Sequence, residues 1–175
     1  MKLKALCLLA LSWVSLSAFY WPFEPVPLHI FSEDPIDHNY KLKPKYTVST
    51  LFLTPEAEES VDLAISAWNQ AAGFNTFITR VDNTTEANIY VALTFESMPA
   101  GMARAYNPKV CVVTVSMLYQ EDPEVFSHEF GHCLGFAHNE ADQEALMQPH
   151  KMQGSPEVGF KTQQTLRHLL GVQDG

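Results

Sequence analysis

Hydrophobic residues recur at helical spacing between residues 55 and 72, where they form one continuous stripe. Its members are Val61, Ala64, Ile65, Trp68, Ala71 and Ala72. Thr54 suits the N-cap of this helix, Pro55 its first position and Gly73 its end. The glutamates of its first turn lie where the helix dipole favours anions, so they do not indicate a calcium site.

Four runs rich in β-branched and aromatic residues predict strands, at 45–53, 74–82, 87–95 and 109–118. The run at 87–95 shows little alternation, so we expect it to be buried on both faces. The loop before the last of these runs contains a possible short edge strand at 102–106.

Two further helices are predicted downstream, one from Pro123 to about Gly135 and one over residues 162–172. The chain therefore reads strand, helix, several strands, helix, loop and helix. This order predicts an α+β or α/β fold in which two main helices pack against one sheet.

Composition limits the classes of protein that remain. A length of 175 residues allows one domain with a substantial core and is too short for two ordinary domains. Hydrophobic residues make up 46% and charged residues 18% of the chain, which is typical of a globular protein. The formal charge of −9 argues against a nucleic-acid partner, because phosphate binding requires clustered Lys and Arg.

The first residues have the pattern of a targeting segment. Lys2 and Lys4 precede an apolar run of about twelve residues, which is shorter than the roughly 20 needed to span a bilayer. We interpret residues 1–17 as a signal peptide, cut after Ser17 or Ala18, rather than as an uncleaved anchor. No later segment is long and apolar enough to span a membrane, so we expect a secreted, periplasmic or extracellular protein.

Residues 18–45 contain five prolines and show no clear period, which predicts an extended arm or short pro-segment. Removal of the signal peptide also removes Cys7 and leaves two cysteines, Cys111 and Cys133. In an exported protein such a pair indicates a disulfide, but two buried thiols acting as small hydrophobic residues are an equal alternative.

The strongest chemical signal is FSHEFGHCLGFAH, residues 126–138. His128 and His132 are four residues apart, so a helix places both imidazoles on one face, close enough to share a metal ion. Gly135 can adopt the left-handed conformation that ends a helix, which allows His138 to return to the same metal. Glu129 lies beside the first ligand without being forced to bind the metal.

Three histidine nitrogens and one open position are typical of a catalytic zinc ion. Zinc lowers the pKa of a bound water molecule, and Glu129 can act as the general base that takes its proton. The pattern therefore predicts peptide-bond hydrolysis without a covalent intermediate. The competing interpretations are surface histidines on an ordinary helix and a zinc site without catalysis.

The motif HEFGHCLGFAH resembles the zinc signature of the metzincin metallopeptidases, and ALMQP at 145–149 resembles their methionine turn. Within that clan the chain is most similar to the matrixin catalytic domain over residues 46–172, also through EANIYVAL and GMARAYNP. The resemblance implies a catalytic domain at 46–175 with a twisted, mostly parallel mixed sheet and an antiparallel edge strand. It also implies two long helices against that sheet and a C-terminal subdomain ending in a third helix.

The resemblance further implies roles for particular residues. Met147 would form an apolar floor beneath the zinc ion without binding it. An extended peptide substrate would lie along the edge strand, and a specificity pocket would be walled by the segment after Met147. The substrate-binding residues so implied are Met102, Ala103, Arg104, Ala105, Tyr106, Pro149 and His150.

The chain also departs from the matrixin pattern. The loop that holds a second zinc ion and calcium in matrixins is reduced here to ESMPAG, so we expect one catalytic zinc ion and no calcium. Asn139 stands where matrixins commonly have serine, and Pro149 where astacins place a tyrosine. No cysteine lies in residues 18–45 to block the zinc ion. The arm could block it instead through His29, Asp34, Asp37 or His38, or it could simply pack on the surface.

The sequence thus predicts a secreted, monomeric zinc endopeptidase. One alternative is an inactive metzincin-like module that binds peptides through the same cleft, although the intact Glu129 argues against it. Another is an aminopeptidase-like metzincin, which requires a blocked end of the cleft and an acidic group for the free amine.

Overall fold

The computed structural model describes residues 42–82, 86–95, 100–107, 110–138, 146–148 and 155–172. The predicted signal peptide and nearly all of the predicted arm lie outside the described residues, as do Asn139, Pro149 and His150. The elements, in order, are β1 (Tyr46–Leu51), α1 (Pro55–Ala72), β2 (Ile78–Arg80), β3 (Ile89–Thr94), β4 (Gly101–Asn107), β5 (Val110–Ser116), a 3-10 turn (Met117–Tyr119), α2 (Pro123–Cys133) and α3 (Phe160–Leu169).

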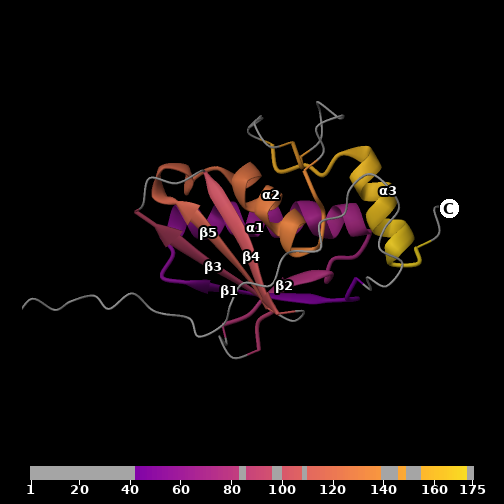
Figure 1. Cartoon of the computed structure of the whole chain (residues 1–175), viewed down its shortest axis with the longest axis horizontal. Helices are drawn as coiled ribbons and strands as arrows, with labels where there is room; N and C mark the ends of the chain where they lie inside the picture. The colour runs from indigo at the N-terminus through magenta and orange to yellow at the C-terminus, as the bar shows by residue number, and fades with distance from the viewer. Residues whose placement is uncertain are drawn as a thin grey trace, which may run out of the picture.

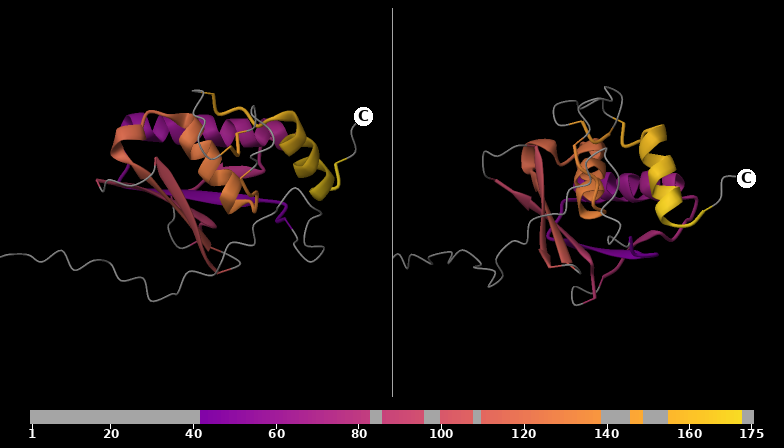
Figure 2. Two further views of the ribbon diagram at one scale, coloured as in Figure 1. Left: turned by 45° about the horizontal axis from the view of Figure 1, so that its top comes forward. Right: turned by 45° about the vertical axis from the view of Figure 1, so that its right-hand side comes forward.

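The five strands form one mixed sheet in the order β2-β1-β3-β5-β4 (Figure 1). All neighbouring pairs are parallel except β4 and β5, so the antiparallel strand β4 lies at an edge. The two views of Figure 2 show α1 and α2 on the same face of this sheet. The α+β class and the mostly parallel sheet with an antiparallel edge strand are therefore confirmed.

The helix α1 carries the buried face that its sequence predicted. Thr54 accepts a hydrogen bond from the backbone N–H of Ala57 (3.2 Å) and so caps the first turn. Gly73 ends the helix with φ of 77°, a conformation that costs glycine little. All six residues of the predicted stripe are buried, and Trp68 is among the largest fully buried side chains of the core.

Some predicted boundaries were wrong for local reasons. The strand β2 begins at Ile78, because the Asn69 side chain accepts a hydrogen bond from Ile78 N–H (2.7 Å) and donates one to Ile78 O (2.9 Å). These bonds hold residues 74–77 as the turn that follows α1. At the end of β5, the side chain of Ser116 caps the 3-10 turn and stops the strand.

The prediction that the run 87–95 is buried on both faces was also wrong. In β3, Ile89 and Val91 are buried, whereas Tyr90 and Ala92 are only half-buried. The reason is tertiary: the helices α1 and α2 cover one face of the sheet, so the strand buries Ile89 and Val91 on one side and leaves its other side partly exposed.

A disulfide joins Cys111 on β5 to Cys133, the last residue of α2, with 5.6 Å between their Cα atoms. The sequence left this pairing open against two free thiols. The bond fastens the C-terminal end of α2 to an interior strand of the sheet, because β5 lies between β3 and the edge strand β4.

Within the described residues, no helix has the length and hydrophobicity needed to cross a membrane.

Replacing Cys111 and Cys133 together by alanine should lower the free energy of unfolding by about 3 kcal/mol, because the bond closes a loop across 22 positions of sequence. Urea denaturation of the oxidised wild type and the double variant measures this difference. Reductant should lower the wild-type midpoint toward that of the variant and leave the variant unchanged. A wild-type midpoint that does not respond to reductant would contradict the bond.

Candidate metal centre

The helix α2 carries the first two histidines, and contacts on its other faces fix its position. Asp122 caps its first turn by accepting a hydrogen bond from the N–H of Glu124 (3.0 Å), and Pro123 takes the first position. Phe126 and Phe130 are buried in the core. The indole N–H of Trp68 on α1 donates to the carbonyl oxygen of Ser127 (2.9 Å), which fixes the helix next to its first histidine.

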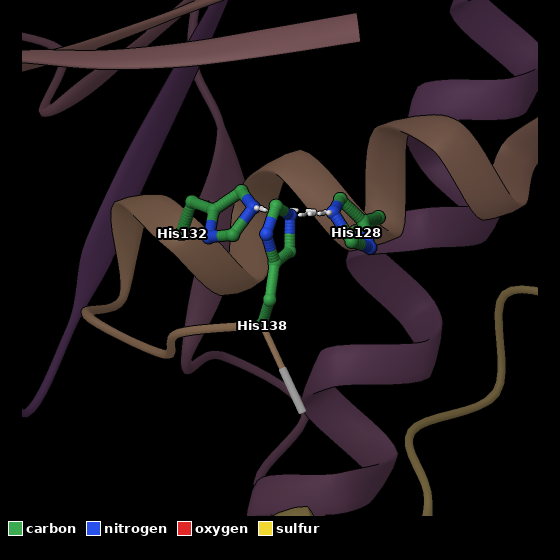
Figure 3. A group of neighbouring side chains, drawn as sticks. All are labelled: His128, His132 and His138. Carbon is green, nitrogen blue, oxygen red and sulfur yellow. Dashed lines mark hydrogen bonds between the residues drawn. The ribbon is translucent and has the colours of Figure 1, made fainter. Parts of the chain in front are cut away.

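The chain turns back sharply after α2. Gly135 has φ of 99°, in the left-handed region that favours glycine, and the N–H of Phe136 donates to the carbonyl oxygen of Gly131 (2.9 Å). This turn brings His138 back toward the two histidines of the helix, as Figure 3 shows.

The three imidazoles meet at their Nε2 atoms (Figure 3). Nε2 of His132 is 3.1 Å from that of His128 and 3.1 Å from that of His138. The remaining side of the triangle, between His128 and His138, is 3.2 Å. The three rings thus point their outer nitrogens at one small space.

The opposite nitrogens of the two helical histidines face backbone carbonyls. Nδ1 of His128 is 2.7 Å from the carbonyl oxygen of Leu146, and Nδ1 of His132 is 2.8 Å from that of Phe136. A carbonyl oxygen can only accept, so each Nδ1 carries the proton and each neutral ring has its lone pair on Nε2. This second contact orients both rings for metal binding.

Burial keeps these imidazoles neutral. It lowers the pKa of His128 and is the main cause that lowers the pKa of His132 to about 4. The neighbouring histidines add to the effect, because a second positive charge in the cluster is unfavourable. Neutral imidazole is the form that binds metals, so the site offers lone pairs at neutral pH.

His128, His132 and His138 could hold a metal ion together. Four tetrahedral ligands at the usual zinc–nitrogen distance of about 2.0–2.1 Å lie about 3.3–3.4 Å from one another. The observed separations of 3.1–3.2 Å are close to this value. The donor type and its spacing are therefore compatible with zinc.

Glu129 lies on the helix between the two ligands and is only 6% exposed. Burial raises the pKa of its carboxyl to about 8, and a hydrogen bond from the backbone of Ala103 on β4 opposes this shift. Its Oε2 atom is buried and has no hydrogen-bond partner among the described residues. A buried carboxyl oxygen that makes no bond to the protein, on a group whose raised pKa reflects a high proton affinity, is suited to exchange a proton with a small ligand.

Met147 is 1% exposed and packs against the helix at Gly131. A Cβ atom added at Gly131 would lie 2.9 Å from Cε of Met147 and 3.1 Å from Cζ2 of Trp68, so glycine is needed for this close approach. The hydroxyl of Ser127 donates to the carbonyl oxygen of Pro156 (2.8 Å), which joins the later segment to the same helix. Met147 thus lies against the helix that carries the histidines.

The implied substrate-binding residues on the edge strand all lie in β4, which packs against α2. Met102 and Ala103 are half-buried, whereas Arg104 is exposed and places its Nε 2.9 Å from the sulfur of Met102. Ala105 and Tyr106 continue the strand.

The sequence did not reveal which groups orient the ligands. The carbonyl oxygens of Leu146 and Phe136 are backbone atoms, so no residue type marks them. Trp68 was predicted only as a core residue, although its indole also bonds the helix beside His128. The one available signal was the position of Phe136 directly after Gly135, where the turn must expose a carbonyl.

Comparison of the chain with protein-family models and with curated proteins gave no match. The interpretation of the site therefore depends on its own residues.

Replacing His128, His132 or His138 by alanine should each weaken zinc binding by more than about 100-fold, because two ligands cannot replace three. Competition with a chromophoric chelator measures the affinity, and the wild type should bind one zinc ion per chain. His168→Ala on α3 is the matched control and should bind zinc like the wild type. Retained affinity in any of the three variants would show that its histidine is not a ligand.

Proposed function

We propose that this chain is an exported zinc-dependent endopeptidase of the metzincin type. The observation that carries the proposal is the convergence of three imidazole Nε2 atoms, 3.1–3.2 Å apart, on a helix that also bears the buried Glu129. A structural zinc site usually fills all four positions with protein ligands, often thiolates. Here both cysteines near the site are joined to each other, so three histidines remain as the ligands among the described residues, and the fourth position would be open.

His128, His132 and His138 would hold the zinc ion. When bound, zinc would polarise the scissile carbonyl and acidify a water molecule in the fourth position. Glu129 takes the proton of the attacking water on its carboxylate and then delivers it to the nitrogen of the leaving amine. The oxygen of the water first bonds to the carbonyl carbon, and the carbon–nitrogen bond then breaks as the nitrogen receives the proton. The products are a carboxyl group and a free amine, and no covalent link to the protein forms.

An extended peptide is the substrate that the sheet favours. Among the described strands, β4 pairs only with β5, so a further strand could bind to its other edge through backbone hydrogen bonds. Because β4 packs against α2, such a peptide would pass beside the histidines and Glu129. Met102, Ala103, Arg104, Ala105 and Tyr106 would then contact it.

Two further observations support the proposal. The Cys111–Cys133 disulfide fits the oxidising compartment that an exported protein reaches. The mostly parallel sheet with its antiparallel edge strand agrees with what the HEFGHCLGFAH and ALMQP resemblance implies. Met147 would lie beside the zinc site as an apolar floor, because it contacts Gly131 between the ligands of the helix.

Glu129→Gln should lower kcat for peptide hydrolysis by about 10²–10⁴-fold, because an amide cannot take the proton of water. Zinc affinity should stay close to that of the wild type, since Glu129 is not a ligand. Internally quenched peptides with the mature, zinc-loaded protein measure the rate, and product mapping on a long peptide shows whether the cuts are internal.

Glu121→Gln is the matched control, because it makes the same chemical change at an exposed carboxylate just before α2. It should leave the rate unchanged, and a chelator should abolish the activity of the wild type. A wild type that binds zinc and peptide without cleaving would favour the peptide-binding module. Stepwise trimming from the amino end would favour the aminopeptidase.

A further inference from the structure

The edge strand β4 has one edge bonded to the sheet and one that faces the site. The N–H of Ser116 donates to the carbonyl oxygen of Ala100 (3.0 Å), which makes these two residues a hydrogen-bonded pair. Hydrogen-bonded pairs alternate along the ladder with pairs that are not hydrogen-bonded. The second kind includes Gly101 with Val115 and Ala103 with Val113. In an antiparallel ladder the N–H and C=O groups of the alternate residues point away from the partner strand. The backbone groups of Gly101 and Ala103 therefore lie on the edge of β4 that β5 does not use.

Glu129 lies against this edge. The backbone of Ala103 lies near enough to its carboxylate to oppose the rise in the Glu129 pKa that burial causes. Gly101 leaves no room for a side chain beside Glu129. A Cβ atom added at Gly101 would lie 2.8 Å from Cγ and 2.8 Å from Oε1 of Glu129. The same atom would lie 3.0 Å from Cγ1 of Val125, which borders the space on its other side.

Space is the reason for glycine at this position. Gly101 is not among the glycines with positive φ, so alanine could adopt its backbone conformation without strain. Separations below 3.0 Å between such carbon and oxygen atoms mean that a neighbour must move. The neighbours are the side chain of Glu129 and, one turn earlier on α2, that of Val125, both of them buried.

We propose that Gly101 is a positioning residue for Glu129: the missing side chain leaves the space in which the carboxylate lies against β4. The inference rests on the proposed peptidase function, in which Glu129 transfers the proton. A methyl group at position 101 would push the carboxylate away from the place where it meets the attacking water. A displacement of about 1 Å at such a group lowers a rate by about 100-fold.

In this arrangement the strand β4 would position both the substrate and the carboxylate of Glu129. The edge of β4 would pair with the substrate, and the same edge sets the position of the carboxylate that acts on the bound peptide. The register between substrate and base would then follow from β4 alone, without a loop between them.

The test is a double-mutant cycle of Gly101→Ala and Glu129→Ala in the full mature chain. Gly101→Ala alone should lower the Tm by at least about 3 °C, because a methyl group is forced into filled space. In the Glu129→Ala background the same substitution should lower the Tm by clearly less, because the side chain that the new methyl group would contact is absent. Gly131→Ala is the matched control. Its Cβ would meet Met147 and Trp68, so it should lower the Tm by the same amount in both backgrounds.

Activity and zinc binding complete the test. Gly101→Ala should lower kcat by about 10–100-fold while zinc affinity and KM stay close to those of the wild type. Additive Tm shifts in the cycle, or an unchanged kcat in an active enzyme, would overturn the positioning role and leave the peptidase proposal standing. An inactive wild type with a coupled cycle would instead overturn the peptidase proposal and leave the contact between Gly101 and Glu129 established.

Discussion

Three imidazole Nε2 atoms converge to within 3.1–3.2 Å of one another, and several contacts of the structure hold them in that arrangement. Neutral nitrogens that carry lone pairs cannot hydrogen-bond to one another, so the cluster is favourable only with a proton or a cation among them. The carbonyl oxygens of Leu146 and Phe136 hold the ring protons on the far side. They thereby direct two lone pairs inward and prepare the site before any ion binds.

The helix α2 can present these groups because it is fixed on several sides. Trp68 of α1 bonds its backbone at Ser127, Met147 packs into the space left by Gly131, and the disulfide of Cys133 joins its end to β5. Each contact restrains a position directly before, between or after the ligands of the helix. Metal affinity depends on such restraint, because a site that is already ordered loses little entropy on binding.

The edge strand β4 connects the metal site to its proposed substrate. It contributes backbone groups of Gly101 and Ala103 to the surroundings of Glu129, and the edge that pairs with no other described strand would bind the proposed extended peptide. An interior strand could not do both, because its hydrogen bonds are used on both sides. The position of β4 at the edge of the sheet is therefore a condition of the proposed chemistry as well as a detail of topology.

Local patterns determined much of this protein in advance. The spacing of His128, Glu129 and His132, the glycine at 135 and the stripe of α1 could all be predicted, because each depends on the geometry of a single helix or turn. The same holds for the class of the fold, which follows from the order of its elements.

Tertiary structure alone decided the features that depend on residues far apart in sequence. The pairing of Cys111 with Cys133 needed the distance between β5 and the end of α2, and the one-sided burial of β3 needed the position of the helices. The closeness of Gly101 to Glu129 also belongs here, because Gly101 lies just before the predicted edge strand at 102–106 and meets Glu129 only where β4 packs on α2. Sequence specifies local geometry through neighbouring residues, whereas these contacts exist only after the sheet and helices have packed together.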